Sequence, residues 1–129
     1  MPSTRWPLVL SALLGMTGVI AGALGAHALA GILGPTQIST WQTAAYYHVI
    51  HAVALLALAI PLSLGHGSRG MTFSVIAFGA GTLLFSGSIY VLLLTGFSAL
   101  GPITPLGGLL LMTGWLNLVR VAWLGYSRT

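Results

Sequence analysis

Long apolar runs separated by short turn-forming segments dominate the chain. Four of these runs have a length close to or above the roughly 20 residues that a helix needs to cross the hydrocarbon core of a bilayer. They cover residues 6–30, 44–64, 71–95 and 105–124. The breaks between them are rich in glycine and proline, which end helices readily. The pattern predicts an all-α integral membrane protein, a four-helix transmembrane bundle forming one domain over residues 1–129.

The N-terminal run has a second interpretation. Arg5, the apolar stretch and the small residues around His27 imitate a secretory signal peptide with its cleavage site. A signal core is typically about 7–15 apolar residues long, and this run is longer, so we interpret it as the first span. Residues 36–43 are more polar and are expected to form an interfacial turn before the second span.

The composition excludes a water-soluble domain as well as disordered and disulfide-stabilised classes. The chain has no aspartate, glutamate, lysine or cysteine. Its charged residues make up 3% of the sequence, compared with about 25% in soluble domains. The isoelectric point near 10.4 reflects the missing acids and not a basic face. We therefore expect a lipid bilayer around the chain and no nucleic-acid partner.

The missing residue types also remove most catalytic and metal chemistry. Without cysteine there are no iron–sulfur ligands, thiolate zinc sites or thiol nucleophiles. Without carboxylates there is no paired-acid hydrolysis and no oxygen cage for calcium or magnesium. We expect no catalytic activity, no cofactor and no metal site.

The arginines predict the orientation. Four spans place the N-terminus, the second loop and the C-terminus on one side, with Arg5, Arg69 and Arg128. Arg120 is near enough to the end of the last span to extend to the same side. The opposite side carries no lysine or arginine. By the positive-inside rule both termini face the cytoplasm, in a bacterial inner (plasma) membrane.

Glycines in the first span predict close helix packing. Gly15, Gly18, Gly22 and Gly25 follow one another at intervals of three or four, which places them in one stripe along a helix. Small residues let helix backbones approach each other in lipid, where the hydrophobic effect does not drive association. We interpret the stripe as packing within the bundle, with an oligomer interface as the alternative.

Polar side chains in the outer half of the spans form the candidate site. They are His27 in the first span, His48 and His51 in the second, and Ser86 and Tyr90 in the third. Together they could line a pocket for a metal, a quinone or a lipid head group, or relay protons. The competing interpretation, which we favour, is that they hydrogen-bond to one another between helices. Two histidines three residues apart are not sufficient to predict a metal site when no third ligand follows at a defined spacing.

Several strings resemble an uncharacterised family of small four-span membrane proteins, domain of unknown function four-two-three, to which a eukaryotic small transmembrane protein is related. The matching strings are GALGAHAL (22–29), WQTA (41–44) with Tyr47 and His51, LFSGSIY (84–90), LTG (94–96) and LGPITPLGG (100–108). The resemblance implies a four-helix inner-membrane protein and supplies no activity. Gln42 stands where many relatives are acidic and His48 where they tend to have glutamine, whereas His27 and His51 match the family pattern.

The sequence therefore favours a multi-pass membrane protein that acts as a structural or accessory component of a membrane assembly. Its partner would be a larger membrane complex or a second copy of the chain. The alternative is binding or transport of a small ligand, lipid, quinone or metal ion at the outer-half cluster of histidine, serine and tyrosine.

Overall fold

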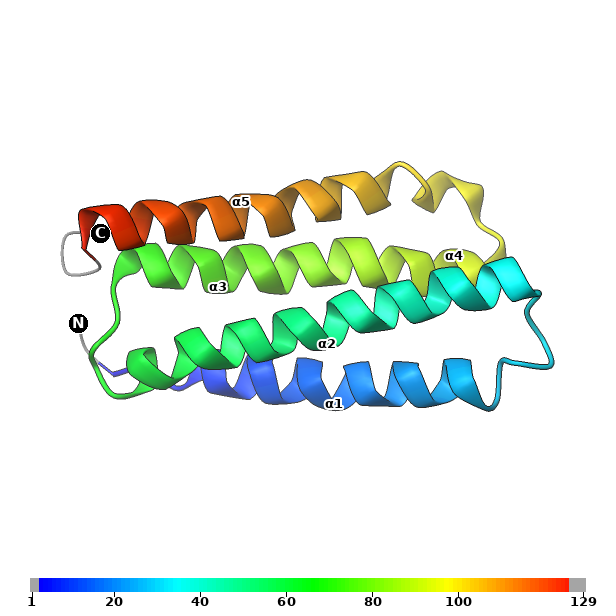
Figure 1. Ribbon diagram of the computed structural model, residues 1–129, viewed down its shortest axis with the longest axis horizontal. Coiled ribbons are helices and arrows are strands. Elements are labelled where there is room, and N and C mark those ends of the chain that lie inside the picture. Colours follow the sequence, from blue (N-terminus) through cyan, green and yellow to red (C-terminus); the bar gives the residue numbers. More distant parts are fainter. Residues whose placement is uncertain (1–2, 126–129) are drawn as a thin grey trace.

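The computed structural model describes residues 3–125, and these are helical apart from short connections (Figure 1). The helices are α1 (Trp6–Ala26), α2 (Pro35–Ser63), α3 (Arg69–Thr82), the π-helical turn η1 (Leu83–Gly87), α4 (Ser88–Thr95), the 3-10 turn η2 (Ser98–Leu100) and α5 (Ile103–Leu124). Because α3, η1 and α4 are continuous, the described residues contain four helical stretches long and apolar enough to cross a membrane. The prediction of four long apolar helices is confirmed, whereas the bounds of the first two differ from those predicted. Arg128 lies outside the described residues.

The four spans run antiparallel to their neighbours and lie side by side in chain order (Figure 1). Helix α1 packs mainly against α2, and α5 packs mainly against α3 and η1. The most apolar stretch of the third span is 50% buried inside the protein, compared with 17% for the last span. Thus α2 and the third span form the centre, and the outer helices present most of their surface to lipid.

Helix α2 begins at Pro35, earlier than predicted. The interfacial turn expected over residues 36–43 is therefore wrong. Gln37 Oε1 accepts a hydrogen bond from the Gly34 backbone N–H at 3.0 Å, which caps the helix. The hydroxyls of Thr40 and Thr43 donate to carbonyls one turn earlier, at 3.1 Å each, so these polar residues are satisfied within the helix.

The length of α2 agrees with a helix that extends beyond the membrane core. Its 29 residues span about 44 Å at 1.5 Å per residue. A hydrocarbon core is about 30 Å thick. Helix α2 is therefore longer than one crossing of the core requires.

The first span ends sooner than predicted, at Ala26. His27 leaves the helical region, with φ −120° and ψ −74°. The Leu29 N–H then bonds to the Leu24 carbonyl at 2.9 Å and turns the chain towards α2.

The predicted glycine stripe of α1 divides into two faces. Gly18 and Gly25 are buried against α2, and a Cβ built on Gly25 would lie 2.6 Å from Trp41 Cδ1. A Cβ on Gly15 or Gly22 would meet nothing within 4 Å. Helix packing inside the protein therefore uses one half of the stripe and leaves the other half open.

The third span contains a π-helical turn that the periodicity did not predict. A π-turn inserts an extra residue into the helix and is often found at functional sites. On one side, Ser86 Oγ of η1 donates to the Ala44 carbonyl of α2 at 2.8 Å. On the other side, the backbone of Gly107 in α5 packs directly against the backbone of η1. The turn is thus fixed between α2 and α5.

Candidate functional site

His48 joins three helices. It is buried in α2, with Nε2 3.0 Å from Thr17 Oγ1 of α1 and Nδ1 3.0 Å from the Tyr90 hydroxyl of α4. The Thr17 hydroxyl is also 2.9 Å from the Leu13 carbonyl. One proton arrangement satisfies every group: Tyr90 donates to Nδ1, Nε2–H donates to Thr17, and Thr17 donates to Leu13. Both ring nitrogens are then occupied.

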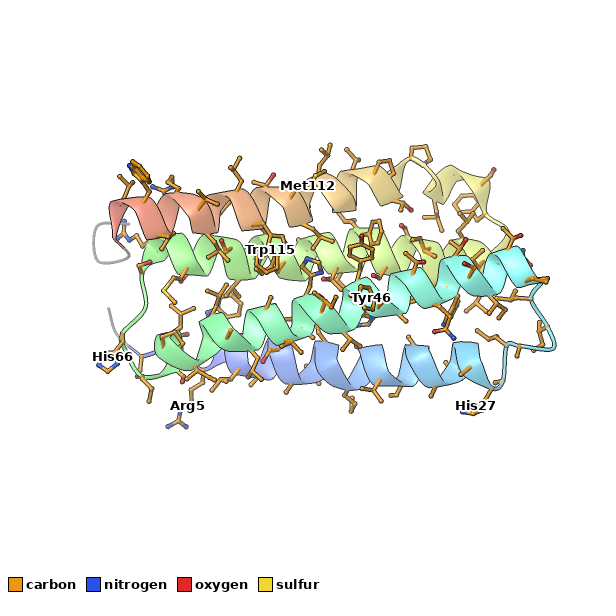
Figure 2. All side chains as sticks on the ribbon, viewed as in Figure 1. Arg5, His27, Tyr46, His66, Met112 and Trp115 are labelled. Carbon is orange, nitrogen blue, oxygen red and sulfur yellow. The ribbon has the colours of Figure 1, made fainter. Side chains whose placement is uncertain are left out.

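His51 joins α2 to α5. Its Nδ1 is 2.7 Å from the Tyr47 carbonyl, and its Nε2 is 3.0 Å from Nε1 of Trp115. The side chain of Trp115 extends from α5 towards α2 (Figure 2). A carbonyl only accepts and an indole N–H only donates, so the proton lies on Nδ1 and the lone pair on Nε2 accepts from Trp115. The His51 ring has no free nitrogen in this arrangement.

The structure separates the residues that were predicted to share one pocket. His48 and Tyr90 are in contact, and Ser86 lies one turn before Tyr90. His51 instead packs against Trp115 of α5, and His27 is exposed at the end of α1, pointing away from the bundle (Figure 2). The structure therefore does not bring the five residues into one pocket. The side chains of residues three apart on a helix point in directions about 60° apart. On a central helix such as α2, this difference is enough for the two side chains to contact different neighbouring helices.

A cavity of about 330 Å³ lies beside His48, between α1, α2 and the third span. We call it the His48 cavity. Its walls include Leu14 and Ile20 of α1, Trp41 and His48 of α2, and Thr82 and Tyr90 of the third span. The Trp41 and Tyr90 rings pack against each other, with centroids 4.6 Å apart. Leu83 and Gly87 of η1 also line the cavity, so the π-turn shapes it.

Thr82 is the unusual polar group of this cavity. It is 2% exposed, and its hydroxyl has no hydrogen-bond partner among the described residues. A buried polar group without a partner costs about 1–3 kcal/mol. Thr82 was not among the site residues predicted from the sequence. The spacing of polar residues could have identified Thr82 as a site residue. Thr82, Ser86 and Tyr90 follow one another at intervals of four and form a polar stripe on one helix face.

A second cavity, of about 260 Å³, lies beside His51 and is lined by Phe85, Gly108 and Trp115, among other residues. No group of three histidines comes together anywhere in residues 3–125. A metal at His48 or His51 would have to displace an existing hydrogen bond. The His48 cavity is therefore better suited to an organic molecule than to a metal ion.

Comparison with known proteins gives a family but no activity. The model of the family described as "Protein of unknown function (DUF423)" matches residues 21–108. The UPF0382 membrane protein SAB0533 of Staphylococcus aureus is 39% identical over 112 residues, covering 87% of this chain and 90% of that protein. YwdK of Bacillus subtilis is 36% identical over 115 residues, covering 89% of this chain and 94% of that protein.

A third relative indicates the membrane. The UPF0382 inner membrane protein YgdD of Escherichia coli is 34% identical over 113 residues, covering 88% of this chain and 86% of that protein. No solved structure matches the chain. The relatives and the four apolar helices agree on a multi-pass protein of the bacterial inner membrane. The chain belongs to the uncharacterised DUF423 (UPF0382) family of membrane proteins.

Proposed function

We propose that the protein is a non-catalytic binding protein whose His48 cavity takes one small neutral lipid. The unpartnered hydroxyl of Thr82 carries this proposal. Its oxygen is covered in the structure, but the residue lines the cavity, so rotation of the side chain would let a ligand oxygen supply the hydrogen bond that no described residue does. This observation favours the ligand-binding alternative over the purely structural role that the sequence favours. The saturated hydrogen bonding of His48 supports binding without chemistry.

The cavity walls define the class of ligand. A volume of about 330 Å³ lies at the lower end of the roughly 300–1,000 Å³ typical of small-molecule pockets. None of the described residues that line the cavity is an arginine, so these walls offer no counter-ion to an anionic head group. Thr82 can donate one hydrogen bond from an otherwise largely apolar wall. A neutral lipid with a carbonyl oxygen, the class that includes quinones, fits these conditions.

Replacing Thr82 by valine tests the site, because valine keeps the shape and removes only the hydroxyl. The free protein should be equally stable or more stable by about 1 kcal/mol, since a buried unsatisfied group is lost. Binding of decylubiquinone, a neutral carbonyl-bearing lipid, should weaken about five- to tenfold. Quenching of tryptophan fluorescence in nanodiscs measures the dissociation constant.

Two further variants complete this experiment. Thr113→Val is the control, because the Thr113 hydroxyl bonds to its own helix at Leu109 and should not affect binding. Gly87→Leu should abolish binding without unfolding the protein, since a Cβ at Gly87 meets nothing within 4 Å. Equal binding by all four proteins, or no binding by the parent, would overturn the proposal.

A second candidate function is that of an accessory component, supported by the open half of the glycine stripe. A groove of about 610 Å³ lies between α1 and α2 and includes Gly15, Met16 and Val53. Glycine at such a surface lets the helix of a partner, or of a second copy, approach closely. The contact would use Gly15 and Gly22, where an added Cβ would meet none of the described residues within 4 Å.

The Gly15→Leu, Gly22→Leu double variant should fold normally. The amount of its oligomer, or of the partner that co-purifies with it, should fall at least about tenfold. This corresponds to about 1.4 kcal/mol of lost helix packing. Crosslinking in native membranes, followed by mass spectrometry, measures the loss. Gly18→Leu is the contrasting variant: a Cβ there would lie 2.8 Å from Val49 Cγ2, so this change should destabilise the fold itself. A parent protein that is monomeric and without a partner would remove this candidate.

Placement of both termini in the cytoplasm is part of the proposal. Arg5 lies just before α1, Arg69 begins α3 and Arg120 lies near the end of α5. In an antiparallel arrangement these positions fall at one end of the molecule, the end where α1 begins and α5 ends (Figure 1). The positive-inside rule supports a cytoplasmic location for that end.

A further inference from the structure

A groove between α3 and α5 lies at the end of the molecule that carries the arginines. It has a volume of about 510 Å³ and is lined by Phe73 of α3 and by α5 residues that include Thr113, Leu116, Arg120 and Trp123. Trp123 is 88% exposed and Phe73 is 49% exposed, although both are aromatic. Exposed tryptophan near the end of a spanning helix is typical of the level of the lipid head groups.

The exposed Arg120 forms a hydrogen bond through one edge of its guanidinium at this groove. Its Nε donates to Asn117 Oδ1 at 3.2 Å. The Asn117 amide in turn donates to the Gly70 carbonyl at 2.7 Å and lies 2.8 Å from Ser74 Oγ. Ser74 is fully buried and donates to the Gly114 carbonyl at 2.8 Å. This network fixes the Nε edge of the guanidinium to both helices.

The remaining donors of Arg120 can bind an anion. The sequence contains no aspartate or glutamate, so no side chain can neutralise the guanidinium. Among residues 3–125, no acceptor is found for its two Nη groups. These groups form a planar fork that matches two oxygens of a phosphate or carboxylate.

The length and charge of the groove suit a phospholipid. From Thr113 to Leu124 the groove follows about 16 Å of α5. An acyl chain is thin enough to lie along the apolar wall beside Leu116. A phosphate attached to such a chain would reach Arg120.

We propose that Arg120 and this groove bind one anionic phospholipid, with the phosphodiester on the Nη fork and an acyl chain along α5. The site is separate from the His48 cavity and does not depend on its ligand. Asn117 acts as the positioning residue because it holds the guanidinium edge. Trp123 and Phe73 flank the head group at the interface.

Native mass spectrometry of the full chain in detergent, with phosphatidylglycerol or phosphatidylcholine added, tests this site. The parent should bind phosphatidylglycerol about tenfold more tightly, and Arg120→Gln should remove that preference. Arg120→Lys keeps the charge but removes the planar fork of donors. Its preference for phosphatidylglycerol over phosphatidylcholine should therefore fall at least about threefold. Arg69→Gln is the matched control, since Arg69 is exposed at the same end but does not line the groove, and it should bind like the parent.

Three results would overturn the proposal. Equal binding of both lipids by the parent would show no anion site. Equal losses in Arg69→Gln and Arg120→Gln would show a general effect of charge. Crosslinking of residue 120 to an acidic residue of a co-purified protein, with no lipid retained, would assign the fork to a partner carboxylate.

Discussion

Replacing Gly107 by alanine should destabilise the protein by about 3 kcal/mol or more, whereas the same change at Gly108 should have little effect. A Cβ built on Gly107 would lie 2.6 Å from the Leu84 carbonyl carbon and would also collide with the backbone of Phe85. Overpacking typically costs about 1–3 kcal/mol where side chains can move. Here the obstacle is the backbone of η1, which Ser86 ties to α2. The helices α5 and η1 would therefore have to separate.

Gly108 is a close control for this prediction. It lies on the same helix and differs by one position, but its Cβ would meet Phe85 Cδ2 at an ordinary 3.8 Å. Both substitutions introduce the same methyl group and raise helix propensity equally. Unfolding by dodecyl sulfate in mixed micelles, followed by circular dichroism, gives the two free energies. Similar values for the two variants would contradict the close contact between α5 and the π-turn.

The number and type of helices were predictable because they depend on local properties. A run of about 20 apolar residues can cross a bilayer only as a helix or within a barrel. The interfacial residues 36–43 were mispredicted because their polarity suggested a turn. Their threonine hydroxyls donate hydrogen bonds to carbonyls of the same helix, and hydropathy does not show these bonds. The π-turn depends on partners from α2 and α5, which sequence periodicity does not contain.

The candidate site was only partly predictable. His48 and Tyr90 were expected to lie together and do so, because both are polar residues at similar depth in adjacent spans. His27 was placed in the same pocket because the end of the first helix was expected four residues too late. His51 was included because it shares a face with His48, but α2 is central and has neighbours on both sides. Thr82 matters because its buried hydroxyl has no hydrogen-bond partner among the described residues. A sequence cannot show that a hydrogen-bond partner is missing.

Truncation of Trp41 to alanine should destabilise the protein by about 3–5 kcal/mol, the range for large buried aromatic residues. Trp41 is 3% exposed. Its indole N–H donates to the Ala21 carbonyl of α1 at 2.7 Å, and its ring packs on Tyr90 of α4. One side chain thus connects α1, α2 and α4 next to the His48 cavity. The control is Tyr46→Ala, because Tyr46 is 64% exposed on the same helix and should cost well under 1 kcal/mol.

A double-mutant cycle with Gly25 shows whether the ring occupies the position beside α1. In the parent, Gly25→Ala should cost about 1–3 kcal/mol, because the new Cβ would lie 2.6 Å from Trp41 Cδ1 and 3.0 Å from its Nε1. In the Trp41→Ala background most of that cost should disappear, since the obstructing ring is gone and the remaining contact, Gln42 Nε2 at 2.9 Å, is the end of a flexible side chain. The two substitutions would then differ from additivity by more than about 1 kcal/mol. Additive free energies would show that Trp41 does not pack against Gly25, and that the cavity wall it forms with Tyr90 is built differently.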